Sequence, residues 1–104
     1  MSALTYLDRA SVRRLLPDVA GRVDALDRTY RAMARGRVEN PPKLGVHPRE
    51  DAFLHAMPAY LADDDVTALK WVAAYPGNPA RGLPYVSGLI VLNDSGTGLP
   101  LAVM

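Results

Sequence analysis

The chain has 104 residues, 49% hydrophobic and 22% charged, which is the composition of a folded protein of one domain. Its 12 Lys and Arg residues nearly balance its 11 Asp and Glu residues, so the net charge of +1 gives no field that attracts nucleic acid or an anionic membrane. The absence of cysteine excludes disulfides, thiolate nucleophiles and Cys-containing metal sites.

Neither the start of the chain nor its apolar runs indicate targeting or membrane insertion. Residues 1–8 have no basic region followed by an apolar core, as a signal peptide would. The longest apolar run, around residues 88–92, is far shorter than the roughly 20 residues of a membrane span. We therefore expect a soluble, cytoplasmic protein without a membrane partner.

The first third of the chain is predicted to form a short strand and two helices. The strand covers residues 4–7, and Asp8 can cap a helix through Arg14, because its carboxylate can accept amide hydrogens of the first turn. Pro17 suits the first position of a second helix, and Gly36 suits a left-handed cap at its end. The spacing of four and three predicts an apolar stripe formed by Val19, Val23, Leu26, Tyr30 and Met33.

The opposite face of this second helix is charged. It carries Arg22, Asp24, Asp27, Arg28, Arg31 and Arg35. Acidic residues alternate with the arginines, so we favour a solvated surface over a nucleic-acid patch.

From residue 40 onward, short strand-like runs are separated by Pro, Gly, Asn and Asp. Each run contains several β-branched or aromatic residues, which favour strands. Strands are predicted over residues 43–46, 52–60, 66–74, 85–93 and 99–103, with turns at 63–65, 76–79 and 94–98. The predicted fold class is α/β, with the helices first and the strands after them.

Lys70 is the first candidate for chemistry. Strand alternation places it on the face shared by Val66, Ala68 and Val72. A desolvated lysine can transfer protons or bind a carboxylate, because its buried charge is costly unless an anion pairs with it. The alternative, which the pattern alone favours, is a lysine that extends to solvent from a sheet edge.

Three further basic residues are weaker candidates. Lys43, at the start of a predicted strand, can join Lys70 in a cationic pocket for a small carboxylate. His47 lies in a predicted loop and His55 on a strand face, and two histidines in such settings are poor metal ligands. A packed or surface role is favoured for both, and no metal site is predicted.

The loop over residues 76–84 is dense in Pro and Gly and is therefore built to a fixed shape. One interpretation is a rigid loop that presents backbone amides to an anion, and the other is a structural crossover. The chain contains no GxGxxG, GxxxxGK[ST], GxSxG or HExxH motif.

Four blocks in a fixed order carry a resemblance to a known family. They are MPAY at 57–60, KW at 70–71, PGNP at 76–79, and GLP at 82–84 followed by LND at 92–94. Over essentially its whole length, the chain resembles the ornithine cyclodeaminase/mu-crystallin family. Members pair an amino-terminal substrate-binding and dimerisation domain with an NAD(P)-binding Rossmann domain. Residues 1–104 would be the first of these, truncated before a Rossmann domain that is absent.

The resemblance also implies an architecture and a set of site residues. Its sheet would be mixed, would follow the helices, and would form part of a barrel-like interface in a homodimer. Lys70 would take part in proton transfer beside the reacting carbon, and Lys43 would hold the substrate carboxylate. Met57 would line the substrate pocket. His55 stands where ornithine-cyclising members have an acidic residue, which argues against ornithine, and Tyr85 would lie near the cofactor.

The activity implied is hydride transfer between NAD or NADP and the α-carbon of a small amino acid or cyclic imine. Reactions in the family include cyclodeamination with ammonia loss, amino-acid dehydrogenation and imine reduction. The chain alone is predicted to be inactive, because most of the cofactor site would lie in the Rossmann domain. The alternative hypothesis is a non-catalytic module that dimerises or binds small carboxylates.

Overall fold

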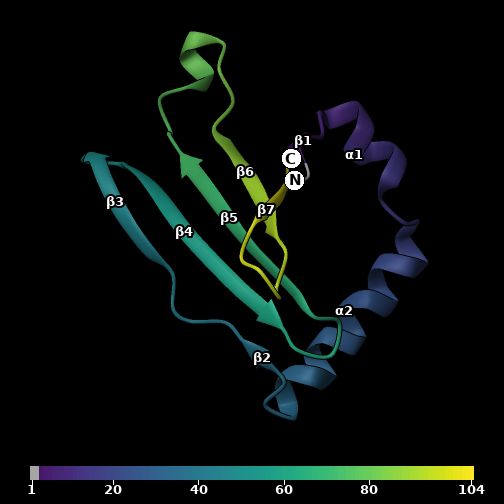
Figure 1. Ribbon diagram of the computed structural model, residues 1–104. Helices are drawn as coiled ribbons and strands as arrows, with labels where there is room; N and C mark the ends of the chain where they lie inside the picture. Colours follow the sequence, from purple (N-terminus) through teal and green to yellow (C-terminus); the bar gives the residue numbers. More distant parts are fainter. Residues whose placement is uncertain (1–2) are drawn as a thin grey trace.

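The computed structural model describes residues 3–104, which form two α-helices and one seven-stranded mixed β-sheet that is not closed (Figure 1). The elements in chain order are β1 (Thr5–Tyr6), α1 (Arg9–Leu15), α2 (Val19–Ala34), β2 (Val38–Glu39), β3 (Leu44–Arg49), β4 (Ala52–Leu61), β5 (Val66–Ala74), the 3-10 helix η1 (Pro79–Arg81), β6 (Val86–Asn93) and β7 (Pro100–Val103). The strand order is β1-β7-β6-β5-β4-β2, and β3 also pairs with β4. Only the β1–β7 pair is parallel, and it makes the sheet mixed.

Local signals define both helix starts. The Asp8 carboxylate accepts a hydrogen bond from the Ser11 amide at 2.8 Å, and Asp18 accepts one from the Gly21 amide at 2.9 Å. Each bond satisfies a first-turn amide that has no partner within its helix. Gly36 follows α2 with φ of 71°, a left-handed conformation that glycine adopts at little cost. The predicted cap at Asp8 and left-handed residue at Gly36 are confirmed.

The prediction for Pro17 was wrong by two positions. Asp18 is the N-cap of α2 and Val19 its first residue, so Pro17 lies just before the cap. A helix beginning at Pro17 would have Leu16 as its N-cap, and a leucine side chain cannot accept a hydrogen bond from the first turn as Asp18 does. The Pro17 carbonyl instead accepts a hydrogen bond from Arg22 Nε at 2.8 Å.

The predicted strands are all present, and β5 has the predicted bounds. Lys43 and Tyr85 were expected to begin strands, but each lies just before its strand. Strand β2 and helix η1 were not predicted, because a strand of two residues and a helix of three residues leave no periodic pattern.

The three central strands form the continuous part of the sheet. The β4–β5 register runs unbroken from Phe53 opposite Ala74 to Leu61 opposite Val66, and β5–β6 pairing is equally regular. Gly88 of β6 is required by close packing, since a Cβ there would lie 2.6 Å from the Trp71 carbonyl oxygen. These strands therefore fix which residues share a face.

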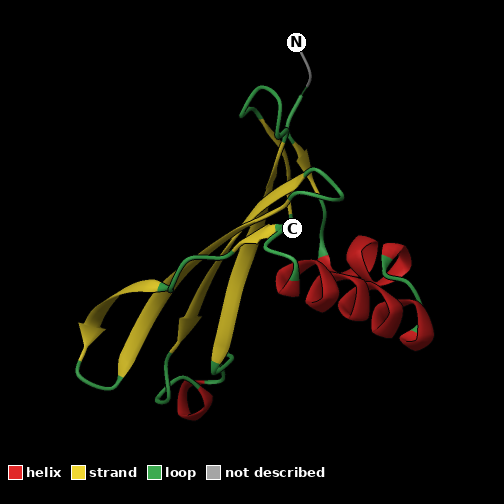
Figure 2. Ribbon diagram, turned by 90° about the horizontal axis from the view of Figure 1, so that it is seen from below, coloured by secondary structure: helices red, strands yellow, loops and turns green. Residues whose placement is uncertain are grey.

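The helices cover little of this sheet. Figure 2 shows both of them to one side of it, while the β3–β4 hairpin and η1 extend away from them. The buried hydrophobic residues are all alanines: Ala32, Ala52, Ala74 and Ala102. The apolar stripe of α2 is exposed instead of packed, with Val19 at 71% and Tyr30 at 68% exposure. Neither helix is long and apolar enough, within residues 3–104, to cross a bilayer.

The exposed surface is large for the mass. It measures 7896 Å², whereas a monomer of this size typically exposes about 5,700 Å². The radius of gyration is 15.8 Å, against about 13 Å for a compact domain of this length. Both the sheet and the helices therefore present apolar faces that no part of residues 3–104 covers.

Candidate functional site

The strand register places Lys70 near the middle of the sheet. It lies opposite Met57 of β4 and Ile90 of β6, on the face that also carries Val72. We call this the lysine face, and the opposite face, which carries Trp71, the tryptophan face. Because β5 is flanked by strands on both sides, the sheet-edge interpretation of Lys70 was wrong. Lys70 is nevertheless exposed to solvent.

Lys43 approaches the same region from the other side of Met57. It directly precedes β3, whose first residue, Leu44, pairs with Ala56 of β4. Lys43 and Met57 line one hollow together with Asn40, Pro41 and Pro42. Met57 thus lies between the two lysines. Strand β3, which Lys43 precedes, and strand β5, which contains Lys70, are about 10 Å apart, or two strand spacings. The structure brings the three predicted residues to one side of the sheet.

His55 occupies the neighbouring row of the lysine face. It pairs with Gly45 and Val72, and its ring stacks on Phe53 with centroids 3.9 Å apart. A Cβ at Gly45 would overlap the Cδ2 atom of His55, so the ring position depends on glycine there. Sequence reasoning missed Gly45, whose importance becomes visible only through the β3–β4 register.

The electrostatic surroundings of His55 favour its neutral form. Desolvation lowers the pKa of His55 below its ordinary value, and the positive charges of Lys43 and His47 lower it further. Within residues 3–104, no group of three or more His, Cys, Asp or Glu side chains is placed to hold a metal ion.

Tyr85 is not brought near the lysines. Its carbonyl accepts the Tyr75 amide hydrogen at 2.9 Å, beside the β5–β6 loop. Ile90, the partner of Lys70 on β6, lies five residues further along, or about 17 Å at the usual rise per residue. A contact between Tyr85 and a cofactor stays a prediction.

The Pro/Gly-rich loop bonds mainly to itself. The Asn78 carbonyl accepts from the amides of Arg81 and Leu83 at 2.8 and 3.0 Å, and the Asn78 side chain donates to the Pro84 carbonyl at 3.0 Å. The Gly82 amide donates to the Pro79 carbonyl. These amides already have hydrogen-bond partners within the loop, which favours a structural role over anion binding. The loop is a hairpin connection between neighbouring antiparallel strands and not a crossover, the form in which the structural alternative was expected.

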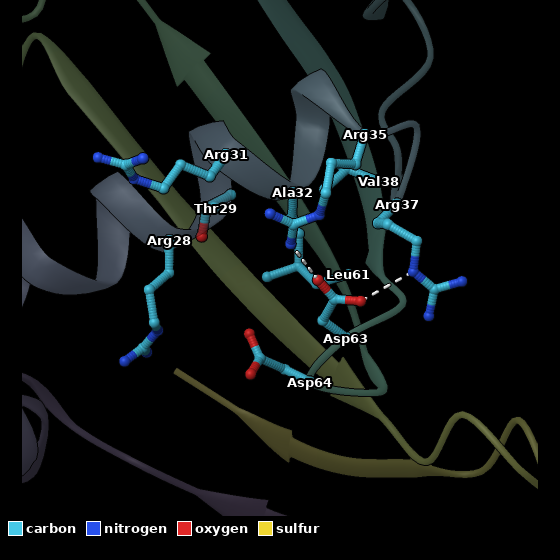
Figure 3. Close-up of a pocket in the computed structure, with 10 residues that line it drawn as sticks. All are labelled: Arg28, Thr29, Arg31, Ala32, Arg35, Arg37, Val38, Leu61, Asp63 and Asp64. Atoms are coloured by element: carbon cyan, nitrogen blue, oxygen red, sulfur yellow. Dashed lines mark hydrogen bonds and ion pairs between the residues drawn. The ribbon is translucent and has the colours of Figure 1, made fainter.

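A hollow of about 170 Å³ lies elsewhere, between the end of α2 and the β4–β5 turn (Figure 3). The Asp63 carboxylate accepts hydrogen bonds from Arg37 Nε at 2.8 Å and Arg35 at 2.9 Å, which together hold the pKa of Asp63 below its usual range. This cluster ties the end of α2 to the turn. Sequence analysis treated Arg35 as part of a solvated face, because nothing local indicates a partner 28 residues away.

The family assignment follows from a match over nearly the whole chain. The ornithine cyclodeaminase/mu-crystallin family model matches residues 6–104. The chain belongs to the ornithine cyclodeaminase/mu-crystallin family. The nodulation efficiency protein NfeD of Rhizobium meliloti is a similar curated protein. It is 42% identical to this chain over 104 residues, which are 100% of this chain and 32% of that protein. The chain thus spans about a third of that relative's length.

Solved structures share the fold. The Δ1-pyrroline-2-carboxylate reductase of Thermococcus litoralis, in complex with NADH and L-proline, matches with a TM-score of 0.91 and 31% identity, over 97% of this chain and 31% of that one. An archaeal alanine dehydrogenase dimer with bound NAD matches with a TM-score of 0.88 and 39% identity, over 97% and 30% of the two chains. These two enzymes, solved with NADH and with NAD, therefore contain this arrangement of helices and sheet.

Proposed function

We propose that residues 1–104 form the substrate-binding and dimerisation domain of an NAD(P)-dependent enzyme. This enzyme transfers a hydride at the α-carbon of a small amino acid or cyclic imine. The observation that carries the proposal is the row of Lys43, Met57 and Lys70 across one face of the sheet. The similarity to a reductase solved with NADH and L-proline supports it.

Each residue of the row has a distinct role in this proposal. Lys43 binds the substrate carboxylate through the single charge of its flexible ammonium group. It does not require the fixed two-bond geometry of an arginine. Met57 gives the pocket an adaptable apolar floor. Lys70 lies beside the reacting carbon and exchanges a proton with the substrate nitrogen or with water as the imine forms or is consumed.

The cofactor would supply only the hydride transfer. Residues 3–104 contain no glycine-rich turn between a strand and a helix, the arrangement that holds a dinucleotide pyrophosphate. These residues therefore do not fit a complete NAD(P) site, and only Tyr85 is proposed to approach the cofactor. We place dinucleotide binding in a separate Rossmann domain, matching the greater length of the relatives.

Dimerisation is proposed through the tryptophan face. Leu44 is 76% exposed and Trp71 39% exposed, and the register puts both on this face together with the exposed Leu89. Exposed apolar faces of this kind mark interaction sites. We propose that a second copy covers this face in a barrel-like interface, as the dimeric state of the archaeal alanine dehydrogenase supports.

A hybrid enzyme tests the proposal. Residues 6–104 replace the matching segment of the archaeal alanine dehydrogenase, and NAD-dependent turnover is measured with a panel of amino acids and imines. We expect turnover by the hybrid and none by the isolated chain. Lys70→Met should lower kcat by about a hundredfold or more, the usual contribution of a proton-transfer group. Lys43→Met should mainly raise KM.

Arg28→Gln is the matched control, since this exposed cation lies on α2, away from the lysine face. A folded, NAD-binding hybrid whose kcat is unchanged by Lys70→Met would overturn the assigned role. A folded hybrid that binds carboxylates without turnover would favour the alternative, a non-catalytic binding or dimerising module.

A further inference from the structure

The lysine face carries positive charge from Lys43 and Lys70, and two histidines beside them can add to it by taking up protons. The four basic residues are Lys43, just before β3, His47 of β3, His55 of β4 and Lys70 of β5. The register places no Asp or Glu on this face of β4, β5 or β6 within residues 3–104. Neither lysine forms an ion pair, and every ion pair in that range joins an arginine to an aspartate. A single substrate carboxylate would leave part of this charge unmatched.

The excess is concentrated at one corner of the face. Lys43, just before β3, and His47, within β3, both lower the pKa of His55, so each lies within electrostatic range of the His55 ring. From β5, Lys70 lies one row away, and β6 contributes only apolar residues and Gly88 to this face.

The nearest acidic residues along the chain do not neutralise this corner. Glu50 and Asp51 lie at the β3–β4 turn and line a different hollow with Tyr75 and Arg81. Neither contributes to the lowered pKa of His55. The corner formed by Lys43, His47 and His55 is therefore purely basic.

We propose that the substrate carries a second carboxylate on its side chain, which makes it an amino dicarboxylic acid or the corresponding imine. This inference rests on the proposed function. Lys43 binds the α-carboxylate in the row formed with Met57 and Lys70. His55, in the neighbouring row, and His47 bind the second carboxylate. A diamino acid would bring its cationic side chain among like charges and would be rejected.

Binding at this corner is coupled to protons. In the free chain, the pKa of His55 is lowered, so the neutral imidazole predominates near neutral pH. A carboxylate beside it favours the imidazolium and raises that pKa, so binding takes up a proton. Affinity for a dicarboxylate should therefore rise as the pH falls from about 8 to about 6.

The test uses the full 104-residue chain, labelled for NMR, and titrates it with aspartate, alanine and ornithine. The signals followed are the His55 ring, the Met57 methyl and the backbone amide of Lys70. We expect aspartate to bind about fivefold more tightly than alanine, the upper range for an exposed ion pair. Ornithine should bind more weakly than alanine, and the pKa of His55 should rise only with aspartate.

Two variants and one control separate the contributions. His47→Gln should weaken aspartate binding and leave alanine binding unchanged. His55→Glu should weaken aspartate binding and strengthen ornithine binding, because it places a negative charge at the corner. Arg28→Gln removes a positive charge at a distant, exposed site and should change neither.

The possible failures are distinct. If alanine binds as tightly as aspartate through Lys43, the substrate class is wrong and the proposed function stands. If ornithine binds most tightly, the substrate class is likewise overturned. If none of the three ligands moves the signals of Met57 or Lys70, the substrate-binding function of this face is overturned as well.

Discussion

The helices and the sheet of this chain are stabilised in different ways. Strands β4, β5 and β6 hold one another through an unbroken ladder, and half-buried side chains cover both faces of β5. Helices α1 and α2 depend on their caps and on the Asp63 cluster, and the α2 stripe at Val23 and Leu26 remains exposed. A regular apolar pattern therefore predicts the type of element in both regions, but it does not show whether the apolar face is covered within this chain.

The largest effect should come from disturbing the ladder. In Gly88→Ala, the new Cβ would lie 2.6 Å from the Trp71 carbonyl oxygen and 3.1 Å from the Val72 Cα, and neither backbone atom can move freely. We expect a loss of about 2 kcal/mol in the free energy of unfolding, measured by urea denaturation. Gly77→Ala is the control, since no atom lies within 4 Å of its Cβ position. Equal effects of the two substitutions would refute the tight β5–β6 packing.

A smaller effect should come from a helix cap. Asp18→Ala removes the acceptor of the Gly21 amide and should lower stability by about 1 kcal/mol. Because the bond is local, amide hydrogen exchange should accelerate in α2 and stay unchanged in β5. Asp24→Ala, an exposed position on the same helix, is the matched control. Acceleration throughout the sheet would contradict the independence of the two regions.

The smallest effect is expected on the exposed stripe. Leu26→Gln should change the free energy of unfolding by less than about 0.5 kcal/mol, as for surface positions in general. Leu69→Gln, at a half-buried position of β5, should cost about 1 kcal/mol. Chemical denaturation of both variants measures the two changes in the free energy of unfolding. A larger loss at Leu26 than at Leu69 would show that the stripe is packed in solution.

Local features of the fold could be predicted from the sequence. The cap at Asp8 and the bounds of β5 depend on neighbouring residues, and both were predicted. Strand alternation also predicted the face of Lys70. The short strand β2 and the shared carboxylate of Asp63 could not be predicted, because they depend on contacts between residues far apart in the chain.

The candidate site divides in the same way. The residue pattern selected Lys70 and Lys43, and family resemblance added Met57, but their common row follows from the pairing of neighbouring strands, which no single segment encodes. The same pairing places His55 over Gly45, a contact that a one-residue register slip would abolish.

The parallel pairing of β1 with β7 has a consequence for the order of folding. Thr5 lies opposite Ala102, so this pair closes a loop of nearly the whole chain. During synthesis, the β4–β5 hairpin can form as soon as residue 74 has left the ribosome, whereas β1 must wait for the last strand to emerge. We therefore expect β1 to pair after β4 and β5, so its backbone groups stay open to other partners, including chaperones, until β7 has formed.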